Sequence, residues 1–262
     1  MTQPVTRIDE KLADVKTKGE KALTLFLTAG FPELHSTPAV VLELEKAGAD
    51  IIELGMPFSD PLADGPIIQQ SSAIALKNGT TLRTILSDVK NIRKSTEIPI
   101  VLMGYLNPIL RYGAETFFAD ARAAGVDGLI LPEVPKEETA RFNEMILGNG
   151  LSNILLVAPT SSSERIEEID RASSGFLYCV STTGVTGADG HTPAQAYVRR
   201  VKSHAKKNPV LVGFGISTSK DARAVARDCD GVIVGSALIK RIMRGRDKRF
   251  REWVAEFKNV LR

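Results

Sequence analysis

Two acidic residues lie in the part of this sequence that is best suited to proton-transfer chemistry. Glu53 lies near the end of the apolar run ADIIEL (49–54), and Asp64 lies in the loop GMPFSDPLADGP (55–66) that follows. Apolar surroundings would desolvate the Glu53 carboxylate and raise its pKa toward neutrality. An acid with such a pKa can both give and take a proton, so we predict general acid–base chemistry here.

Both acidic residues also have structural interpretations. A buried Glu is often paired with a cation, but no Lys or Arg stands at the C-terminal end of any strand that the sequence predicts, which favours a functional Glu53. Asp64 could cap the helix that begins near Pro66, and the sequence alone supports this role at least as well as a catalytic one. The loop is nevertheless long for a strand-to-helix connection, as lids and binding segments often are.

Three later segments combine glycine with small hydroxyl residues in a pattern typical of anion sites. They are STTGVTGADGHTP (181–193), GFGIST (213–218) and GSALI (235–239). Glycine lets a phosphate approach the backbone closely, and a short helix that opens at Ser236 would add its N-terminal amide groups. A tight turn explains each glycine alone, but three such loops at one rim predict a phosphorylated substrate.

Other catalytic chemistries have little support in the sequence. Schiff-base catalysis would need a Lys at a strand end, and a metal site would need clustered ligands. Neither pattern is present, because the three histidines, His35, His191 and His204, are scattered along the chain. The remaining possibility is that carboxylates transfer protons on a phosphate ester. Tyr178 is a further candidate catalytic residue, and its alternative role is core packing.

The composition is that of an ordinary globular protein. The 262 residues carry a net charge of +3, with 25% charged and 43% hydrophobic residues, which argues against disorder and against a chain that coats nucleic acid. No apolar run approaches the roughly 20 residues that cross a bilayer, and the polar N-terminus lacks a secretory signal. Cys179 and Cys229 lack CxxC spacing and are expected to be buried thiols, so we predict a cytoplasmic protein.

Short apolar runs alternate with helical segments along the whole chain. We predict eight strands at 22–28, 49–54, 98–103, 126–131, 153–158, 175–181, 208–213 and 230–235. Helical spacing and capping signals predict helices at 36–48, 67–77, 82–94, 115–124, 136–147, 164–172, 193–206 and 218–227. The strand runs are almost continuously apolar, as parallel strands covered on both faces are.

Eight strands, each followed by a helix, favour a single (β/α)8 (TIM-type) barrel of the α/β class. No Pro- or Ser-rich linker interrupts the chain, so one domain over residues 1–262 is expected. An extra N-terminal helix with Ile8, Leu12 and Val15 on one side could close the barrel floor. A stronger apolar stripe from Phe250 to Leu261 should pack the last helix on the barrel wall.

Specific motifs then point to a family. ELGMPFSDPLADGPIIQ, together with LTAGFP, LMGYLNPI, STTGVTG, GFGIS and GSALI in this order, closely resembles the tryptophan synthase α subunit family over about residues 22–240. The resemblance implies a lyase that cleaves indole-3-glycerol phosphate by a reversible retro-aldol reaction to indole and glyceraldehyde 3-phosphate.

The resemblance also assigns expected roles to particular residues. Glu53 and Asp64 match the two catalytic carboxylates, and Tyr178 matches an active-site tyrosine. The expected phosphate ligands are Gly187, Gly215, Gly235 and Ser236. The expected residues of the indole pocket or its rim are Phe26, Leu102 and Tyr105.

Family resemblance further implies a partner. Members pair with a β subunit that holds pyridoxal phosphate, as an α2β2 complex in which indole is channelled to β, and no cofactor or metal is expected in this chain. The expected contact residues are Pro57, Asp60, Asn107 and Pro108. Two residues depart from the family pattern: some members carry Arg at the position of Thr182, and Asp is common at the position of Glu133. These departures bear on the closure of the lid and on the fit to the β subunit, and not on the proton chemistry.

Two other functions are compatible with parts of the pattern. Another phosphate-binding barrel, such as an isomerase or indole-glycerol-phosphate synthase, would need a catalytic Lys at a strand end or an Asp pair on the first and fifth strands. The runs ALTLFLT and NILLVA contain neither. A regulatory or scaffold protein that has lost catalysis is the alternative from another class, and the retained Glu53, Asp64 and Tyr178 argue against it.

Overall fold

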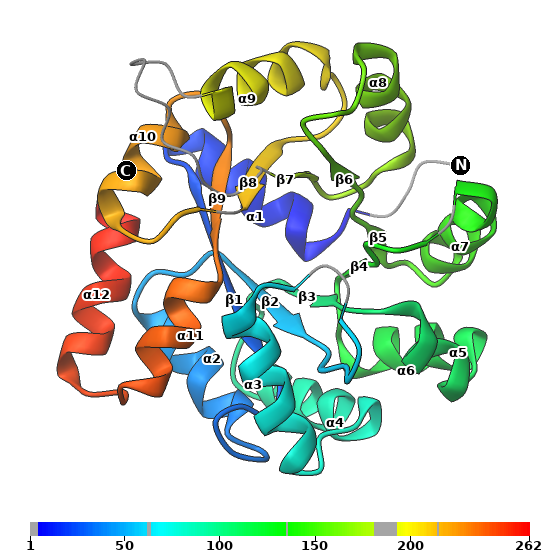
Figure 1. Ribbon diagram of the computed structural model, residues 1–262, viewed down its shortest axis with the longest axis vertical. Helices are drawn as coiled ribbons and strands as arrows, with labels where there is room; N and C mark the ends of the chain where they lie inside the picture. Colours follow the sequence, from blue (N-terminus) through cyan, green and yellow to red (C-terminus); the bar gives the residue numbers. More distant parts are fainter. Residues whose placement is uncertain (1–4, 62–63, 135, 181–192, 214) are drawn as a thin grey trace.

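Parallel strands form a barrel inside a ring of helices in the computed structural model, which describes residues 5–61, 64–134, 136–180, 193–213 and 215–262 (Figure 1). The strands are β1 (Ala22–Thr28), β2 (Ile51–Gly55), β3 (Ile100–Met103), β4 (Gly128–Ile130), β5 (Ser152–Asn153), β6 (Leu156–Val157), β7 (Leu177–Val180), β8 (Val210–Gly213) and β9 (Gly231–Val234). Each lies within or beside a strand that the sequence predicts.

The barrel closes through the fifth predicted strand. The sheet order is β5-β4-β3-β2-β1-β9-β8-β7-β6, so its two end strands are the two halves of the predicted run 153–158. Between these halves, the Ile154 amide donates to the Leu129 carbonyl at 2.9 Å, and the Tyr178 amide donates to the Leu155 carbonyl at 3.0 Å. This segment therefore pairs with β4 on one side and β7 on the other, and the predicted barrel is confirmed.

The helices surround this sheet. They are α1 (Arg7–Thr17), α2 (Thr37–Lys46), α3 (Pro66–Lys77), α4 (Leu82–Arg93), α5 (Leu106–Tyr112), α6 (Ala114–Ala124), α7 (Lys136–Gly148), α8 (Ser163–Ala172), α9 (Pro193–His204), α10 (Ser219–Ala226), α11 (Ser236–Met243) and α12 (Lys248–Asn259). The sequence did not predict α5, because it is short and carries Pro108 in its first turn.

The strands are buried on both faces, which explains their apolar sequences. On β1, Leu23, Leu25 and Leu27 belong to the core beneath the helices, whereas Ala22 belongs to a second cluster inside the barrel. Both faces of β1 are therefore covered, and its burial pattern is continuous from the first residue to the last.

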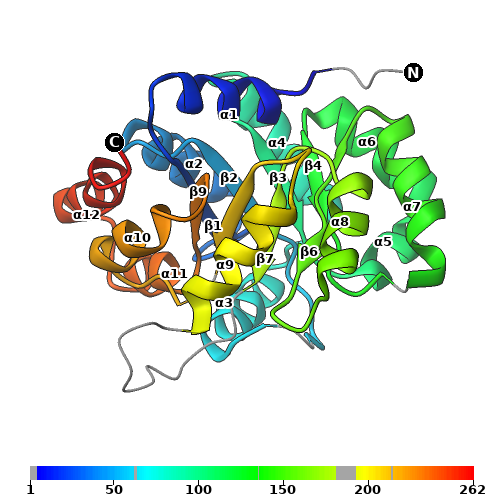
Figure 2. The same cartoon turned by 90° about the horizontal axis from the view of Figure 1, so that it is seen from above.

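Helix α1 closes one end of the barrel, as predicted. Thr6 and Asp9 form a capping box that starts the helix, and Ile8, Leu12 and Val15 join the cluster inside the barrel. Figure 2 shows α1 across one end of the strands, opposite α3. The C-terminal ends of the strands therefore form the end that a substrate can reach.

Helix α12 covers the barrel wall, as the apolar stripe predicts. Phe250, Val254 and Phe257 are buried in the core beneath the helices, and Leu261 beyond the helix is buried with them. Within the described part of the chain, no helix has both the length and the apolar character to cross a membrane.

Candidate functional site

A cavity of about 350 Å³ opens at the C-terminal ends of the strands. Its walls come from β1, β2, β3, β7 and β9, from the loops after β8 and β9, and from the N-terminal parts of α3 and α11. The lining residues are Phe26, Glu53, Asp64, Gly65, Pro66, Ile67, Ile68, Met103, Tyr178, Gly215, Ile216, Ser217, Ile233, Gly235, Ser236, Ala237 and Lys240. Seven of the residues that the sequence singled out are therefore brought together in one place.

Glu53 is a buried acid that has no partner among the residues that the structure describes. Its side chain points inward from β2, the residue is 1% exposed, and neither carboxyl oxygen has a hydrogen-bond partner in that part of the chain. Burial, with a smaller effect from the Asp64 charge, raises the pKa of Glu53 from its ordinary value of 4.5 to about 8. Pairing with a buried cation is not seen among the described residues, so this carboxyl group is free to react.

Asp64 faces the same cavity from the loop before α3. The residue that caps α3 is Gly65, and no side chain accepts a hydrogen bond there, so Asp64 does not serve as the helix cap. Burial raises the pKa of Asp64, while a hydrogen bond from the Tyr105 side chain lowers it. Tyr105 itself is buried, which gives Asp64 a fixed orientation at the cavity wall.

Tyr178 points into the cavity from β7. The residue is buried, and burial together with the Glu53 charge raises the pKa of its hydroxyl, so Tyr178 remains a neutral donor and acceptor. On the neighbouring strand β8, Gly213 leaves room for this ring: a Cβ atom at position 213 would lie 2.3 Å from the Tyr178 hydroxyl oxygen.

We expect Gly213→Ala to displace the Tyr178 ring and to lower the free energy of unfolding by roughly 1–3 kcal/mol, as overpacking in a core does. Denaturant unfolding measures this change. Gly148→Ala is the matched control, because its added Cβ would meet no atom within 4 Å. An unchanged free energy of unfolding in Gly213→Ala would show that the Tyr178 ring can adopt another conformation without cost.

One corner of the cavity is suited to an anion. Gly235 is the N-cap of α11 and Ser236 is its first residue, and among the described residues no side-chain cap hydrogen bond is present there, so the first amide groups of α11 can donate hydrogen bonds to an anion. Gly215, at φ +72°, faces the same space from the loop after β8. Gly187, the fourth predicted phosphate ligand, lies outside the described residues.

The sequence did not single out Lys240, although it lines the same cavity. It lies four residues after Ser236 on α11, and that spacing places both residues on one face of the helix. The spacing is visible in the sequence, but Lys240 lies in the second turn of a helix, outside the strand ends and loops that usually carry the functional groups of a barrel.

The apolar wall of the cavity corrects one prediction. Phe26 lines the cavity, and with Asp64 and Tyr105 it also borders a small adjoining hollow of about 20 Å³. Leu102 does not line either space, because it is fully buried in the core beneath the helices. Side chains alternate along a strand, so the neighbouring Met103 faces the cavity, and the prediction of Leu102 was wrong by one position.

Tyr105 connects the rim of the cavity to the loop after β2. Its ring lies 5.0 Å from the Phe58 ring, between centroids, at an interplanar angle of 32°. Beside it, Glu133 accepts a hydrogen bond from the Leu106 amide at 2.9 Å and thus stabilises the start of α5. Glu133 therefore has a structural role, whereas Thr182 lies outside the described residues.

The predicted contact residues lie on the same rim but differ in exposure. Asp60 and Asn107 are exposed, Pro108 is half-buried, and Pro57 is buried within the chain itself. Pro57 therefore offers little surface to another protein, and any partner contact in this region would fall mainly on Asp60 and Asn107.

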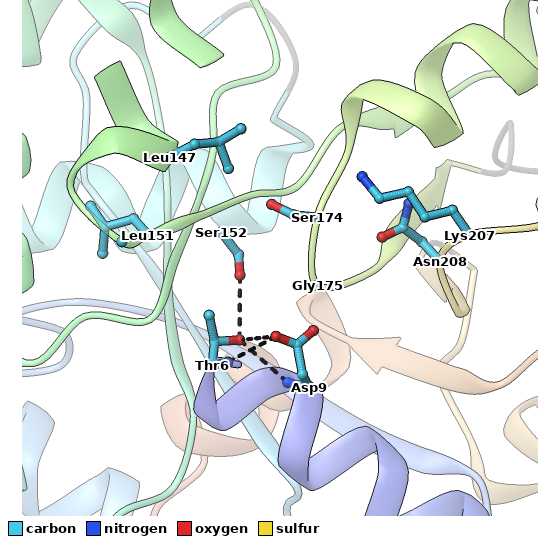
Figure 3. Close-up of a pocket in the computed structure, with 10 residues that line it drawn as sticks. Thr6, Asp9, Leu147, Leu151, Ser152, Ser174, Gly175, Lys207 and Asn208 are labelled. Atoms are coloured by element: carbon cyan, nitrogen blue, oxygen red, sulfur yellow. Dashed lines mark hydrogen bonds between the residues drawn. The ribbon is translucent and has the colours of Figure 1, made fainter. Parts of the chain in front are cut away.

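A second hollow, of about 170 Å³, lies at the opposite end of the barrel beside α1 (Figure 3). Its polar side chains already have partners within the protein. Thr6 contacts Asp9 and Ser152, and Lys207 donates to the carbonyls of Arg171 and Ser173. Among the described residues that line this hollow, each polar side chain has a hydrogen-bond partner, whereas the Glu53 carboxyl oxygens in the large cavity have none in the described part of the chain.

No group of three or more His, Cys, Asp or Glu residues suited to a metal ion is present in the described ranges. Glu53 and Asp64 are the two acidic side chains among the described residues that line the large cavity. Such a pair is suited to proton transfer.

Comparison with known proteins gives one consistent result. The family described as "Tryptophan synthase alpha chain" matches residues 12–260. The tryptophan synthase alpha chain of Citrifermentans bemidjiense is 50% identical over 260 residues, covering 98% of this chain and 97% of the relative. That of Geobacter sulfurreducens is 48% identical over 260 residues, covering 98% of each chain.

Solved structures agree with the sequence comparison. Tryptophan synthase subunit alpha from Legionella pneumophila str. Paris aligns with a TM-score of 0.90 at 37% identity, over 98% of this chain and 99% of that chain. A chain of tryptophan synthase from M. tuberculosis in its aminoacrylate-bound form aligns with a TM-score of 0.88 at 34% identity, over 98% and 100% of the two chains.

Proposed function

This chain belongs to the tryptophan synthase alpha chain family, and from that membership we propose that Glu53 and Asp64 carry the proton chemistry of the family's reaction. The chain is a lyase that cleaves indole-3-glycerol phosphate to indole and glyceraldehyde 3-phosphate in tryptophan biosynthesis. The observation that supports the assignment is the buried Glu53 carboxyl group, unpaired and facing the same cavity as Asp64.

The cleavage moves two protons and breaks one C–C bond. Indole C3 gains a proton, which makes the ring an indolenine-like cation, and the hydroxyl group on the adjacent side-chain carbon loses a proton. The electrons of the breaking bond return to the ring, and the hydroxyl-bearing carbon becomes the aldehyde. One group that first gives and then takes a proton is sufficient for both transfers.

Glu53 has the pKa that this role requires. With a pKa of about 8 it is mostly protonated at neutral pH, so it can supply the proton to C3, and the resulting carboxylate can accept the hydroxyl proton. Tyr178 faces Glu53 in the cavity and stays neutral, so we assign it a hydrogen bond to the reacting part of the substrate.

Asp64 is assigned to the indole ring. A carboxylate that accepts a hydrogen bond from the ring N–H stabilises the cationic ring, and this interaction becomes stronger as the positive charge develops. The hydrogen bond from Tyr105 favours the charged form of Asp64. Phe26 and Met103 supply apolar surface for the ring.

The phosphate is assigned to the opposite corner of the cavity. Gly215, Gly235 and Ser236 present backbone groups and the positive end of α11 there. We retain Gly187 as a fourth proposed ligand on the family resemblance alone.

The family relationship also gives the partner. Tryptophan synthase alpha subunits work with a β subunit in α2β2 complexes, and this chain is one such alpha subunit. We propose that the β subunit carries the pyridoxal phosphate, that this chain needs no cofactor, and that Asp60, Asn107 and Pro108 contribute to the contact. A cytoplasmic location and a single domain over residues 1–262 remain part of the proposal.

Release of indole from indole-3-glycerol phosphate tests the proposed function directly. Indole is measured with the chain alone and after mixing with a tryptophan synthase β subunit. Indole production that rises with the β subunit supports both the reaction and the partner. No indole under either condition would favour the alternative of a regulatory or scaffold protein.

We expect Asp64→Asn to retain more activity than a change at Glu53. The amide oxygen can still accept a hydrogen bond from the ring N–H, but the charge is lost, and a charge-assisted hydrogen bond contributes about twice as much as a neutral one. Steady-state indole release should therefore fall roughly 10-fold, mainly in kcat. A completely inactive Asp64→Asn variant would instead identify Asp64 as a second proton carrier.

A further inference from the structure

Lys240 is a cation without a partner in the wall of the catalytic cavity. It lines the cavity with Gly235 and Ser236, and none of the described residues forms an ion pair or hydrogen bond with it. Its neighbour on α11, Arg241, differs in this respect, because it pairs with Asp247 at 2.8 Å. The charge of Lys240 is therefore available to a ligand.

The helix directs Lys240 toward the anion corner. Side chains of an α-helix lean toward its N-terminus, and residues four positions apart lie on one face. Lys240 follows Ser236 by four positions. Its side chain therefore extends along α11 toward the amide groups at the start of the helix and not toward the far end.

The charge balance of the cavity shows why a cation is needed there. Among the described lining residues, Glu53 and Asp64 are the acidic side chains, and Lys240 is the basic one. A phosphate monoester carries about −1.5 to −2 charges at neutral pH. Without Lys240, the phosphate would enter a cavity that already contains acidic side chains. Only the amide dipoles at the start of α11 would then stabilise its negative charge.

We propose that Lys240 is a positioning residue for the substrate phosphate, which it holds by a charge-assisted hydrogen bond over the start of α11. The inference rests on the proposed function, because it takes the phosphate end of the substrate to lie at this corner. The buried and unpaired Glu53 in the same cavity is an independent sign that a ligand binds there.

The test uses the reverse reaction, in which indole and glyceraldehyde 3-phosphate are separate substrates. In Lys240→Gln, the KM for glyceraldehyde 3-phosphate should rise about 10-fold, the effect of losing one charge-assisted hydrogen bond, while the KM for indole and kcat change little. Lys240→Arg should recover most of the affinity because it keeps the charge. A structural defect would change both KM values together.

Lys220→Gln is the matched control. Lys220 lies in the first turn of α10, also after a barrel strand, and it is exposed, but it does not line the cavity. The variant removes the same charge from the protein and should keep the wild-type KM for glyceraldehyde 3-phosphate. An equal rise in Lys220→Gln and Lys240→Gln would mean that only net charge matters, and would overturn the proposal.

Calorimetric titration with glycerol 3-phosphate gives the same test without turnover. Lys240→Gln should bind it about 10-fold more weakly than the wild type, and its affinity should depend less on salt. An unchanged affinity rejects Lys240 as a phosphate contact while wild-type cleavage leaves the proposed function intact. A wild-type chain that binds glycerol 3-phosphate through Lys240 but never cleaves indole-3-glycerol phosphate would reject the function and keep the site.

Discussion

Glu53→Gln is expected to lose nearly all indole release and to keep its fold. The amide has nearly the same shape as the carboxyl group but cannot give or accept the transferred proton, and loss of a general acid–base group lowers the rate by roughly 10²- to 10⁴-fold. Among the described residues, the native side chain has no hydrogen-bond partner that the amide would lose. Indole release and thermal unfolding, measured on the same preparation, check both parts.

The pH dependence of stability gives a second measurement on this variant. The folded-state pKa of Glu53, about 8, lies above its ordinary value of 4.5, so the carboxyl group favours the folded state at low pH and loses this contribution as the pH rises through that window. Gln does not titrate. Glu53→Gln should therefore gain stability relative to the wild type between about pH 4.5 and 8.

A neutral substitution elsewhere provides the control for Glu53→Gln. Glu115 is exposed at the start of α6 and is not among the residues that line the cavity, so Glu115→Gln should keep normal turnover. Near-normal turnover in Glu53→Gln would remove Glu53 from the mechanism. A parallel pH profile for the stability of Glu53→Gln and the wild type would show that the carboxyl group is not desolvated as the structure indicates.

Most of the fold can be predicted from the sequence because a parallel barrel leaves a simple pattern. Strands that are covered on both faces are continuously apolar, and each is followed by a helix with recognisable caps. The exceptions are local. The fifth strand is divided because residues 154–155 pass from pairing with β4 to pairing with β7, and α5 is too short to produce a helical pattern.

The candidate site could be predicted less completely, for geometric reasons. Glu53 and Asp64 were predictable because Glu53 lies near the C-terminal end of a strand and Asp64 lies in the loop that follows, which places both at the active end of a barrel. Leu102 was predicted to line the cavity, but its neighbour Met103 does so instead. Alternate residues of a strand face opposite sides, and every residue of the run IPIVLM is apolar apart from Pro99, so the sequence does not reveal which set faces inward. The Tyr105 hydrogen bond to Asp64 joins two loops that are distant in sequence, and no local pattern predicts it.

Asp127 should be the polar residue whose loss most destabilises the barrel. It is fully buried before β4, where it pairs with Arg7 of α1 at 2.9 Å and Arg93 of α4 at 2.7 Å, and it accepts the Ile100 amide at 2.8 Å. Burial raises the pKa of Asp127 despite these partners, so desolvation offsets much of what the ion pairs contribute.

Removing only Asp127 leaves the largely buried Arg93 guanidinium without its anion, whereas Arg7 keeps its ion pair with Glu97. A buried charge that has lost its partner is the costly case for such a network. We expect Asp127→Ala to lower the free energy of unfolding by about 3–5 kcal/mol, measured by denaturant unfolding. The control, Asp14→Ala, breaks the exposed pair with Lys18 at 2.6 Å and should cause no measurable change.

Adding Arg93→Met to Asp127→Ala should restore part of the lost stability, because one unpaired guanidinium group is then removed as well. A double variant less stable than Asp127→Ala would show that Arg93 stabilises the barrel through its carbonyl contacts with Gly125 and Ile98 more than through the ion pair.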